Sequence, residues 1–311
     1  MKVGIVRNPV SGGGKMQSRW HAIESAIHNQ FPSCDIVLTG APGHASVLAH
    51  DFAKDGYDLV IAVGGDGSIG EVADGLLRFE GERPALSIIS SGTGADFARN
   101  FELPSEPDRL VSAIANATPR TIDAGKVTYI REDGSTGTRH FVNIGSLGVS
   151  GPTSRAVNAV KHRGKASGKL MFQYHTIREL LRYKFQDVMI SLDGAEPFEA
   201  RIAVVVVANA PWFGGGMKIA PQADMTDGQF DVLVFRAASK LKLLLDMNQV
   251  YSGTHLQNPL VSLHRARSVE VRPSGNLPVN AALVDVDGES PGCIPARYEI
   301  LPGALKLRLP L

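Results

Sequence analysis

The sequence predicts two regions of different class, an α/β region at the N-terminus and a β-rich region after it. Up to about residue 124, short apolar runs alternate with segments in which apolar residues recur every three or four positions. That alternation is typical of a parallel sheet with helices on both faces. Beyond it, short apolar runs flank Asp-Gly pairs, which is typical of antiparallel strands. A length of 311 residues is enough for about two domains of roughly 150 residues each.

In the first region every predicted element has its own apolar pattern. The expected strands are 2–6, 35–38, 59–63 and 85–89. The first helix carries an apolar stripe made by Trp20, Ile23, Ile27 and Phe31. A second helix begins after Pro42-Gly43, and a third begins near Ile69. Because strands and helices alternate, ligands are expected at the carboxyl ends of the strands.

In the second region the first strands come in pairs. One pair, 126–130 and 140–144, flanks Asp133-Gly134, and another, 188–192 and 201–207, flanks Asp193-Gly194. Further strands are expected at 230–235, 268–271, 279–286 and 298–301, and helices at 168–183 and 240–251. The predicted domains are therefore 1–124 and 125–301.

The composition excludes several classes of protein. With 43% hydrophobic and 20% charged residues, the chain is not intrinsically disordered. Lys and Arg number 32 against 31 Asp and Glu, and a net charge of +1 argues against binding of nucleic acid by bulk charge. The longest apolar run, 202–208, is far shorter than the roughly 18 residues of a spanning helix. The N-terminus has no signal-peptide layout, so we expect a cytoplasmic protein.

Three glycine-rich loops follow predicted strands, and the first is Asn8-Pro9-Val10-Ser11-Gly12-Gly13-Gly14-Lys15. Its spacing fits neither a Walker A loop nor a Rossmann fingerprint, since Gln17 stands where the fingerprint has glycine. Glycines at the start of a helix still let backbone N–H groups approach an anion closely. The alternative is an ordinary strand-to-helix turn.

The second loop, Gly64-Gly65-Asp66-Gly67-Ser68, joins a strand to a helix. Such a junction offers free amides and a positive dipole end to a polyphosphate. The carboxylate of Asp66 would repel phosphate unless a cation bridges the two, which points to Mg²⁺. The alternative is that Asp66 only shapes a turn.

The third loop runs over residues 91–99 and contains Thr93 and Asp96. Thr93 is a candidate hydrogen-bond donor to phosphate or ribose. Asp96 supplies a second carboxylate, and a helix N-cap is the alternative role for it. If the strand exits share one edge of the sheet, Asp66, Asp96 and Asp123 would cluster around a catalytic Mg²⁺.

In this order and spacing the loops resemble the diacylglycerol kinase catalytic domain family, of the bacterial soluble lipid kinase type. The likeness extends over nearly the whole chain, through Gly168-Lys169-Leu170, Asn209, Asp227-Gly228, Asp287-Gly288-Glu289 and Pro302-Gly303-Ala304-Leu305. It implies an N-terminal Rossmann-like nucleotide-binding domain, to which residues 302–311 return, and a C-terminal antiparallel β-sandwich for the lipid. It also implies Mg²⁺-dependent transfer of the γ-phosphoryl group of ATP to a lipid hydroxyl such as that of diacylglycerol.

The resemblance implies roles for individual residues. Nucleotide contacts fall on Asn8, Thr39, Gly64, Gly65, Asp66, Gly67, Ser68 and Thr93, and the neighbouring Asp96 and Lys15 are added to them. A structural Mg²⁺ falls on Asp224, Asp227 and the backbone of Gln229, with Asp123 as a further metal candidate. The chain departs from the family at Ala95, where Asn is usual, and at Ser68, where Thr is commoner.

Phosphoryl transfer to an alcohol needs charge neutralisation and a base for the departing proton. Glu289 is the first candidate for this base, and Asp287 is the alternative. Asp66 is the acid expected to act in catalysis through Mg²⁺. On a continuous strand, positions 287 and 289 would share a face, whereas a strand end at Gly288 would splay them.

The expected partners are a lipid substrate and a membrane surface. A basic stretch would attract anionic headgroups at about 1 kcal/mol per side chain, unless it is a solvated face or contacts phosphate; it comprises Arg155, Lys161, His162, Arg163, Lys165 and Lys169. Trp212 and Phe213 are candidates for a lipid-facing tip, with core packing as the alternative. A homodimer is left open. The competing functions are an NAD kinase-like phosphotransferase and a catalytically silent nucleotide- or lipid-binding regulator.

Overall fold

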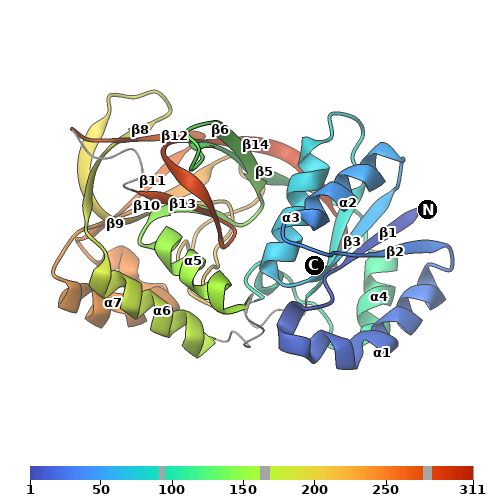
Figure 1. Ribbon diagram of the computed structural model, residues 1–311. Coiled ribbons are helices and arrows are strands. Elements are labelled where there is room, and N and C mark those ends of the chain that lie inside the picture. The colour runs from blue at the N-terminus through green and yellow to red at the C-terminus, as the bar shows by residue number, and fades with distance from the viewer. Residues whose placement is uncertain (91–94, 162–168, 276–281, 311) are drawn as a thin grey trace. The chain divides into compact units, whose positions relative to one another are not determined.

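The computed structural model describes residues 1–90, 95–161, 169–275 and 282–310 (Figure 1). The chain divides into two compact units, Met1–Ile122 with Gly303–Leu311, and Asp123–Pro302. Both units combine helices and strands, and the second is richer in strands. The mixed α/β class with a sheet-rich second part, as the sequence predicts, is therefore confirmed.

The sheet of the first unit is built from strands that pair in parallel. β1 (Val3–Arg7) lies between β2 (Cys34–Leu38) and β3 (Leu59–Gly64), and β4 (Ala85–Ser90) pairs with the other side of β3. The end of β14 (Glu289–Leu307) joins β4 through the pair Leu307 and Leu86. Since β1 and β3 are buried along their whole length, their sequences are nearly all apolar. The carboxyl ends of β1 to β4 all reach one edge.

Two pairs of helices cover this sheet. α1 (Lys15–Gln30), which follows the short η1 (Ser11–Gly14), packs against α4 (Pro107–Asn116). α2 (His44–Lys54) packs against α3 (Asp66–Arg78), and the two pairs lie on opposite sides of the sheet (Figure 1). Gly75 permits the contact between α2 and α3, because a Cβ there would lie 2.1 Å from Ser46 O. α4 is absent from the sequence prediction; its buried stripe is only Leu110, Val111 and Ile114.

The strands of the second unit pair antiparallel, and several of them close into a ring. They are β5 (Arg120–Ile130), β6 (Thr136–Phe141), β7 (Ile144–Gly148), β8 (Gln186–Leu192), β9 (Phe198–Ala208), β10 (Phe230–Arg236), β11 (Val261–Ala266), β12 (Ser268–Pro273), β13 (Leu283–Val286) and most of β14. The pairing runs from β14 through β13, β7, β9, β8 and β12 and returns to β14. The pairings therefore describe a barrel, where the family resemblance implies a two-layered sandwich. The barrel closes because the long strands β9 and β14 each pair with different neighbours along their length.

Two predicted strands differ from the observed ones. The expected strand 140–144 is interrupted between β6 and β7, because the amides of Val142 and Ile144 turn toward the carboxylate of Asp287. The expected strand 279–286 is described as β13 (Leu283–Val286), and residues 279–281 lie outside the described part of the chain.

The helices of the second unit pack on this barrel and on one another. α5 (Ser150–Lys161) contacts β7 and β13, α6 (Lys169–Arg182) contacts α5 and α7, and η3 (Thr254–Gln257) follows α7 (Lys240–Ser252). α5 is absent from the sequence prediction because its buried positions include Ser150, Thr153 and Ser154 instead of an apolar stripe. No helix in the described part of the chain is long and apolar enough to cross a membrane.

Alternate residues of the barrel strands form its core. Phe141 stacks on Phe230 with ring centroids 5.7 Å apart. On β13, Val284 and Val286 belong to this core. Asp285 lies between these two valines, so its side chain points to the opposite face of the strand, where α5 packs.

Candidate active site

Hydrogen bonds join the loop after β1 to the loop after β3. Asn8 N donates to Val63 O (2.9 Å), and Asn8 Nδ2 donates to Ser68 Oγ (2.9 Å). Gly64 lies where the loops meet, because a Cβ there would be 2.6 Å from Ser68 Cβ. Three of the residues expected to contact nucleotide, namely Asn8, Gly64 and Ser68, are therefore brought together at the sheet edge.

Asp66 connects a third loop to this edge. It is the first residue of α3, directly after Gly65, and its Oδ1 accepts a hydrogen bond from Phe97 N (3.1 Å). A carboxylate in the first turn of a helix is stabilised by the positive end of the helix dipole. Asn8 after β1 and Phe97 after β4 thus both bond to the loop that follows β3, in which glycines 65 and 67 are half-buried.

The segment after β4 contains one buried acid and one strained backbone position. Asp96 is buried, and its Oδ1 lies 3.6 Å from Arg99 Nε, just before η2 (Ala98–Asn100). Ala95 has a φ of 49°, in the left-handed region that Asn adopts more readily than Ala. The departure from the family pattern therefore falls on a position where the backbone favours the usual residue. Thr93 lies outside the described residues.

Two more residues expected to contact nucleotide lie on neighbouring elements. Thr39 follows β2, the strand next to β1, and its N donates to Arg7 O (2.9 Å) at the end of β1. Lys15 begins α1, but its side chain lies outside the described part of the chain. The side chain of Arg7 is a buried positive charge. The sequence analysis misses it, because Arg7 stands at the end of a predicted strand. Its guanidinium lies 4.1 Å from the centre of the Trp20 ring and donates to Gln17 Oε1 (2.7 Å).

In the second unit, Asp123 holds the loop 224–229. Its N donates to Met225 O (2.6 Å), and its Oδ2 accepts from Gly228 N (2.7 Å). Asp123 is thereby grouped with the expected metal loop, whereas Asp66 and Asp96 belong to the first unit. Asn209 supports the same place, since its Nδ2 donates to Asp123 O (3.0 Å).

The expected metal ligands in this loop offer oxygen atoms of the kind that Mg²⁺ prefers. Asp224 Oδ1 accepts from Thr226 N (2.9 Å), and Asp227 Oδ1 accepts from Gln229 N (3.0 Å). In each carboxylate the second oxygen, Oδ2, is therefore not the one that bonds to these backbone amides. Asp227 Oδ2 lies 3.4 Å from Arg265 Nη1, which already supplies positive charge. Within the described residues, no group of three or more His, Cys, Asp or Glu is arranged to hold a metal ion. The donor chemistry fits Mg²⁺, with two carboxylates and a backbone carbonyl.

The pair Asp287-Gly288 forms the turn between β13 and β14. Both residues have positive φ, 48° and 85°, and Val286 pairs with Glu289 across the turn, as in a two-residue type I′ hairpin. The carboxylate of Asp287 accepts from Ile144 N (2.8 Å) and Val142 N (3.1 Å). Burial raises the pKa of Asp287 to about 6, although these backbone hydrogen bonds oppose the rise. Asp287 and Glu289 are therefore splayed by the turn instead of sharing a strand face.

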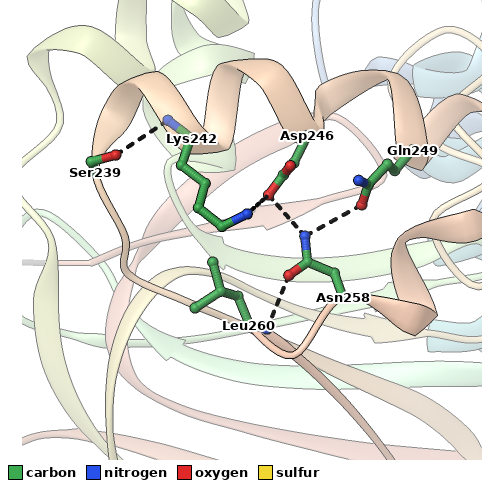
Figure 2. A network of polar contacts seen from close by, with 6 residues as sticks. All are labelled: Ser239, Lys242, Asp246, Gln249, Asn258 and Leu260. Carbon is green, nitrogen blue, oxygen red and sulfur yellow. Dashed lines mark hydrogen bonds and ion pairs between the residues drawn. The ribbon is translucent and has the colours of Figure 1, made fainter.

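The second unit also contains a partly open apolar cavity of about 130 Å³, lined by α5, α6, α7 and neighbouring strands. Phe213 lines it, so this side chain belongs to the cavity wall, and Trp212 O accepts a hydrogen bond from Asn143 Nδ2 (2.8 Å). Figure 2 shows a polar network that includes the cavity-lining residues Asp246 and Asn258. Asn258 Nδ2 donates to Asp246 Oδ2 (2.8 Å), and Lys242 Nζ donates to the same oxygen (3.1 Å). This network fixes α7 to the segment that precedes β11.

Comparison with known proteins gives the class and then the family. Residues 2–127 match the diacylglycerol kinase catalytic domain, and residues 143–309 match the YegS C-terminal NAD kinase beta sandwich-like domain. With glycine loops at a sheet edge and an acidic hairpin, these matches identify a kinase, an enzyme that transfers phosphoryl groups. The chain belongs to the diacylglycerol kinase family, and it is a lipid kinase of the bacterial soluble type.

The relatives cover almost the entire chain. A diacylglycerol kinase of Mycobacterium tuberculosis (strain CDC 1551 / Oshkosh) is 30% identical over 311 residues, which is 99% of this chain and 95% of that protein. A solved structure described as a diacylglycerol kinase from Bacillus anthracis str. Sterne has a TM-score of 0.78 at 24% identity, covering 99% of this chain and 95% of its own. An NAD kinase from Archaeoglobus fulgidus in complex with ATP shares the fold, with a TM-score of 0.50 at 16% identity over 100% and 92% of the chains.

Proposed function

We propose that this enzyme transfers the γ-phosphoryl group of ATP to the hydroxyl of a lipid such as diacylglycerol, with Mg²⁺ as the accompanying cation. The observation that carries the proposal is the meeting of three loops at one sheet edge, through the Asn8–Ser68 and Asp66–Phe97 hydrogen bonds. Backbone amides and helix starts at such an edge are suited to a polyphosphate. The first unit would then be the Rossmann-like ATP-binding domain, with its last residues returning from the second.

On the nucleotide side, the proposed contacts are Asn8, Thr39, Gly64, Gly65, Gly67, Ser68, Thr93 and Lys15, with the acids Asp66 and Asp96. When bound with ATP, Mg²⁺ would neutralise charge that builds up during phosphoryl transfer. Asp66 is the acid best suited to bring it there, since it lies among the glycines at the start of α3. Asp96 is buried behind this loop and paired with Arg99, which favours a positioning role.

On the acceptor side, Glu289 is the proposed general base. Both oxygens of the alternative, Asp287, accept backbone hydrogen bonds, so Asp287 is better suited to hold the turn that presents Glu289. Glu289 is half-exposed at the first position of β14, where a substrate hydroxyl has access. A carboxylate base within reach of an alcohol typically contributes 10²–10⁴-fold to the rate, as an order of magnitude.

A second Mg²⁺ is proposed for the loop of Asp224, Asp227 and Gln229, which Asp123 holds in place. Its role there would be structural, because the N–H and the Oδ2 atom of Asp123 anchor this loop through hydrogen bonds. Addition of EDTA is expected to lower the melting temperature of the wild type more than that of Asp227→Asn. Equal responses of the two proteins would count against this metal.

Contact with a membrane is proposed for the outer faces of α6 and α7. Tyr174, Ile177 and Leu181 share one exposed face of α6, and Leu241 and Leu245 of α7 are 68% and 71% exposed. The inner faces of both helices line the apolar cavity, so the same two helices carry exposed apolar side chains and cavity-lining ones. A lipid bilayer is the partner that fits, because it holds the proposed substrate. Most of the basic stretch, from Lys161 to Lys169, lies outside the described side chains, while Arg155 pairs with Glu132 at 3.0 Å.

This surface is tested by co-sedimentation with vesicles of phosphatidylcholine and phosphatidylglycerol. The double variant Leu241→Ser, Leu245→Ser is expected to lose most of its vesicle binding. Val47→Ser is the matched control, because Val47 is similarly exposed (56%) but lies on α2 of the first unit. Unchanged binding of the double variant would contradict the proposal. A cytoplasmic location and a homodimer stay predictions from the sequence.

The rival phosphoryl acceptor is NAD⁺, favoured by the NAD kinase-like description of the second domain. A single assay separates the candidates: γ-labelled ATP is offered with dioctanoylglycerol, with a sphingoid base, with NAD⁺, or with no acceptor. We expect label in dioctanoylglycerol. Label in NAD⁺ would establish the rival, and label in none of the acceptors would favour a silent regulator.

A further inference from the structure

Asp285 is a buried acid that the proposed reaction leaves unused. It is 4% exposed, and it lies on β13 opposite Ser146 of β7. Because Val284 and Val286 face the barrel core, the Asp285 side chain lies on the other side of the strand, against α5. The sequence analysis passes over it, since it reads as one more residue of an apolar strand next to the Asp-Gly-Glu motif.

Hydroxyl groups satisfy only one side of this carboxylate. Ser146 Oγ donates to Asp285 Oδ2 at 3.3 Å, and it lies 2.8 Å from the hydroxyl oxygen of Ser150. Asp285 Oδ1 is buried without a hydrogen-bond partner among the described residues. Burial raises the pKa of Asp285 to about 7, against hydrogen bonds from Ser154 and Ser146. A buried acceptor left unpaired is unfavourable, so such an atom indicates a missing donor.

The place where this donor would come from is the apolar cavity. Asp285 lines it, together with the hydroxyl residues Ser150 and Ser154 and the apolar residues Leu180, Val204 and Val250. A water molecule needs about 10–15 Å³ of cavity volume, so a cavity of about 130 Å³ accommodates a much larger molecule. A wall of apolar side chains does not hold water well, and one unpaired carboxylate oxygen calls for one hydroxyl.

The geometry points to a binding site for a lipid alcohol, in which part of an aliphatic chain fills this cavity and a hydroxyl of the lipid donates to Asp285 Oδ1. This inference deepens the proposed function and rests on it, by naming the residue that holds the acceptor lipid. Asp285 lies four residues before Glu289 on the same hairpin, and the two carboxylates influence each other electrostatically. A hydroxyl held at Asp285 is thereby kept near the proposed base. Asp285 acts as a binding residue and takes no proton in this scheme.

The test compares a lipid alcohol with its methylated analogue. Binding of dioctanoylglycerol and of its 3-O-methyl ether to the full chain is measured by titration without ATP. The wild type is expected to bind the alcohol at least 10-fold more tightly than the ether. Asp285→Leu, which keeps the volume but removes the acceptor, is expected to bind the two ligands equally. Val250→Trp, which fills the cavity, is expected to lose at least 10-fold in affinity for both.

Glu270→Gln is the matched control, because Glu270 is an acid of the same unit that pairs with Arg297 at 2.7 Å and is not among the residues that line the cavity. Its preference for the alcohol is expected to match that of the wild type. Equal binding of alcohol and ether by the wild type would overturn the inference, even if Asp285→Leu fails to fold. If Asp285→Leu still transfers phosphoryl groups to the lipid and still binds the alcohol in preference to the ether, the inference is overturned and the proposed function stands. Selective binding without phosphoryl transfer would do the reverse.

Discussion

The two units prepare their candidate sites in opposite ways. In the first unit, glycines, helix starts and strand ends present backbone amides at one sheet edge, with Asp66 among them. In the second unit, acids are removed from water, and desolvation raises the pKa of Asp285, Asp287 and Asp231. Amides and helix dipoles suit a polyanion, whereas desolvated carboxylates suit a neutral hydroxyl. This difference supports the proposal that the first unit binds the nucleotide and the second unit binds the lipid.

The largest effect expected from the second unit is on catalysis. Glu289→Gln removes the proposed base but keeps its shape, so kcat should fall by about 10²–10⁴-fold. The KM for ATP should stay within about twofold, since the glycine loops are untouched. Steady-state kinetics with dioctanoylglycerol measures both. Glu132→Gln, an exposed acid paired with Arg155, is the control and should keep its rate. A normal kcat in Glu289→Gln would show that Glu289 is not the general base for the lipid hydroxyl.

The next effect concerns the pH dependence of stability. Since the pKa of folded Asp285 is raised from its ordinary value near 4 to about 7, the folded state binds more protons than the unfolded state between these values. This contribution to stability is complete below about pH 4 and is lost as the pH rises through about 7. Relative to Asp285→Asn, the wild type should therefore lose up to about 4 kcal/mol over this window. Urea unfolding at four pH values measures the difference, and parallel curves would contradict it.

Asp287 distinguishes a structural acid from a catalytic one on the same hairpin. Asp287→Asn places an amide N–H where a backbone amide of Val142 or Ile144 now donates, so stability should fall by about 1–3 kcal/mol. Asn tolerates the positive φ of this position. The remaining activity should exceed that of Glu289→Gln at least tenfold, measured at a temperature where both variants are folded. The reverse order of activities would assign the base to Asp287.

The smallest expected effect is in the first unit. Ala95→Asn relieves the left-handed backbone of this position and should stabilise the protein by about 1 kcal/mol. Ala98→Asn is the control, because Ala98 is not among the described residues with positive φ. Thermal unfolding measures both variants. A loss of stability in Ala95→Asn would mean that the side chain has no room there.

The same contrast explains what the sequence can predict. The glycine loops of the first unit are predictable because each follows its own apolar strand, and parallel strands bring their ends to one edge. The role of Asp287 is not predictable from the sequence, because its hydrogen-bond partners Val142 and Ile144 lie more than 140 residues away in the chain. α5 escapes prediction because it buries Ser150, Thr153 and Ser154, so no apolar period marks it. Asp285 is missed for a related reason, since its orientation depends on the register of β13.

The central claim, that the edge of the first sheet holds ATP for transfer to a lipid, is tested most directly at Asp66. Wild type and Asp66→Asn are compared for transfer of label from γ-labelled ATP to dioctanoylglycerol, with Asp51→Asn, on the exposed face of α2, as the control. We expect labelled lipid from the wild type and the control, and at least about 10³-fold less from Asp66→Asn. Full transfer by Asp66→Asn, or none by the wild type, would contradict the account.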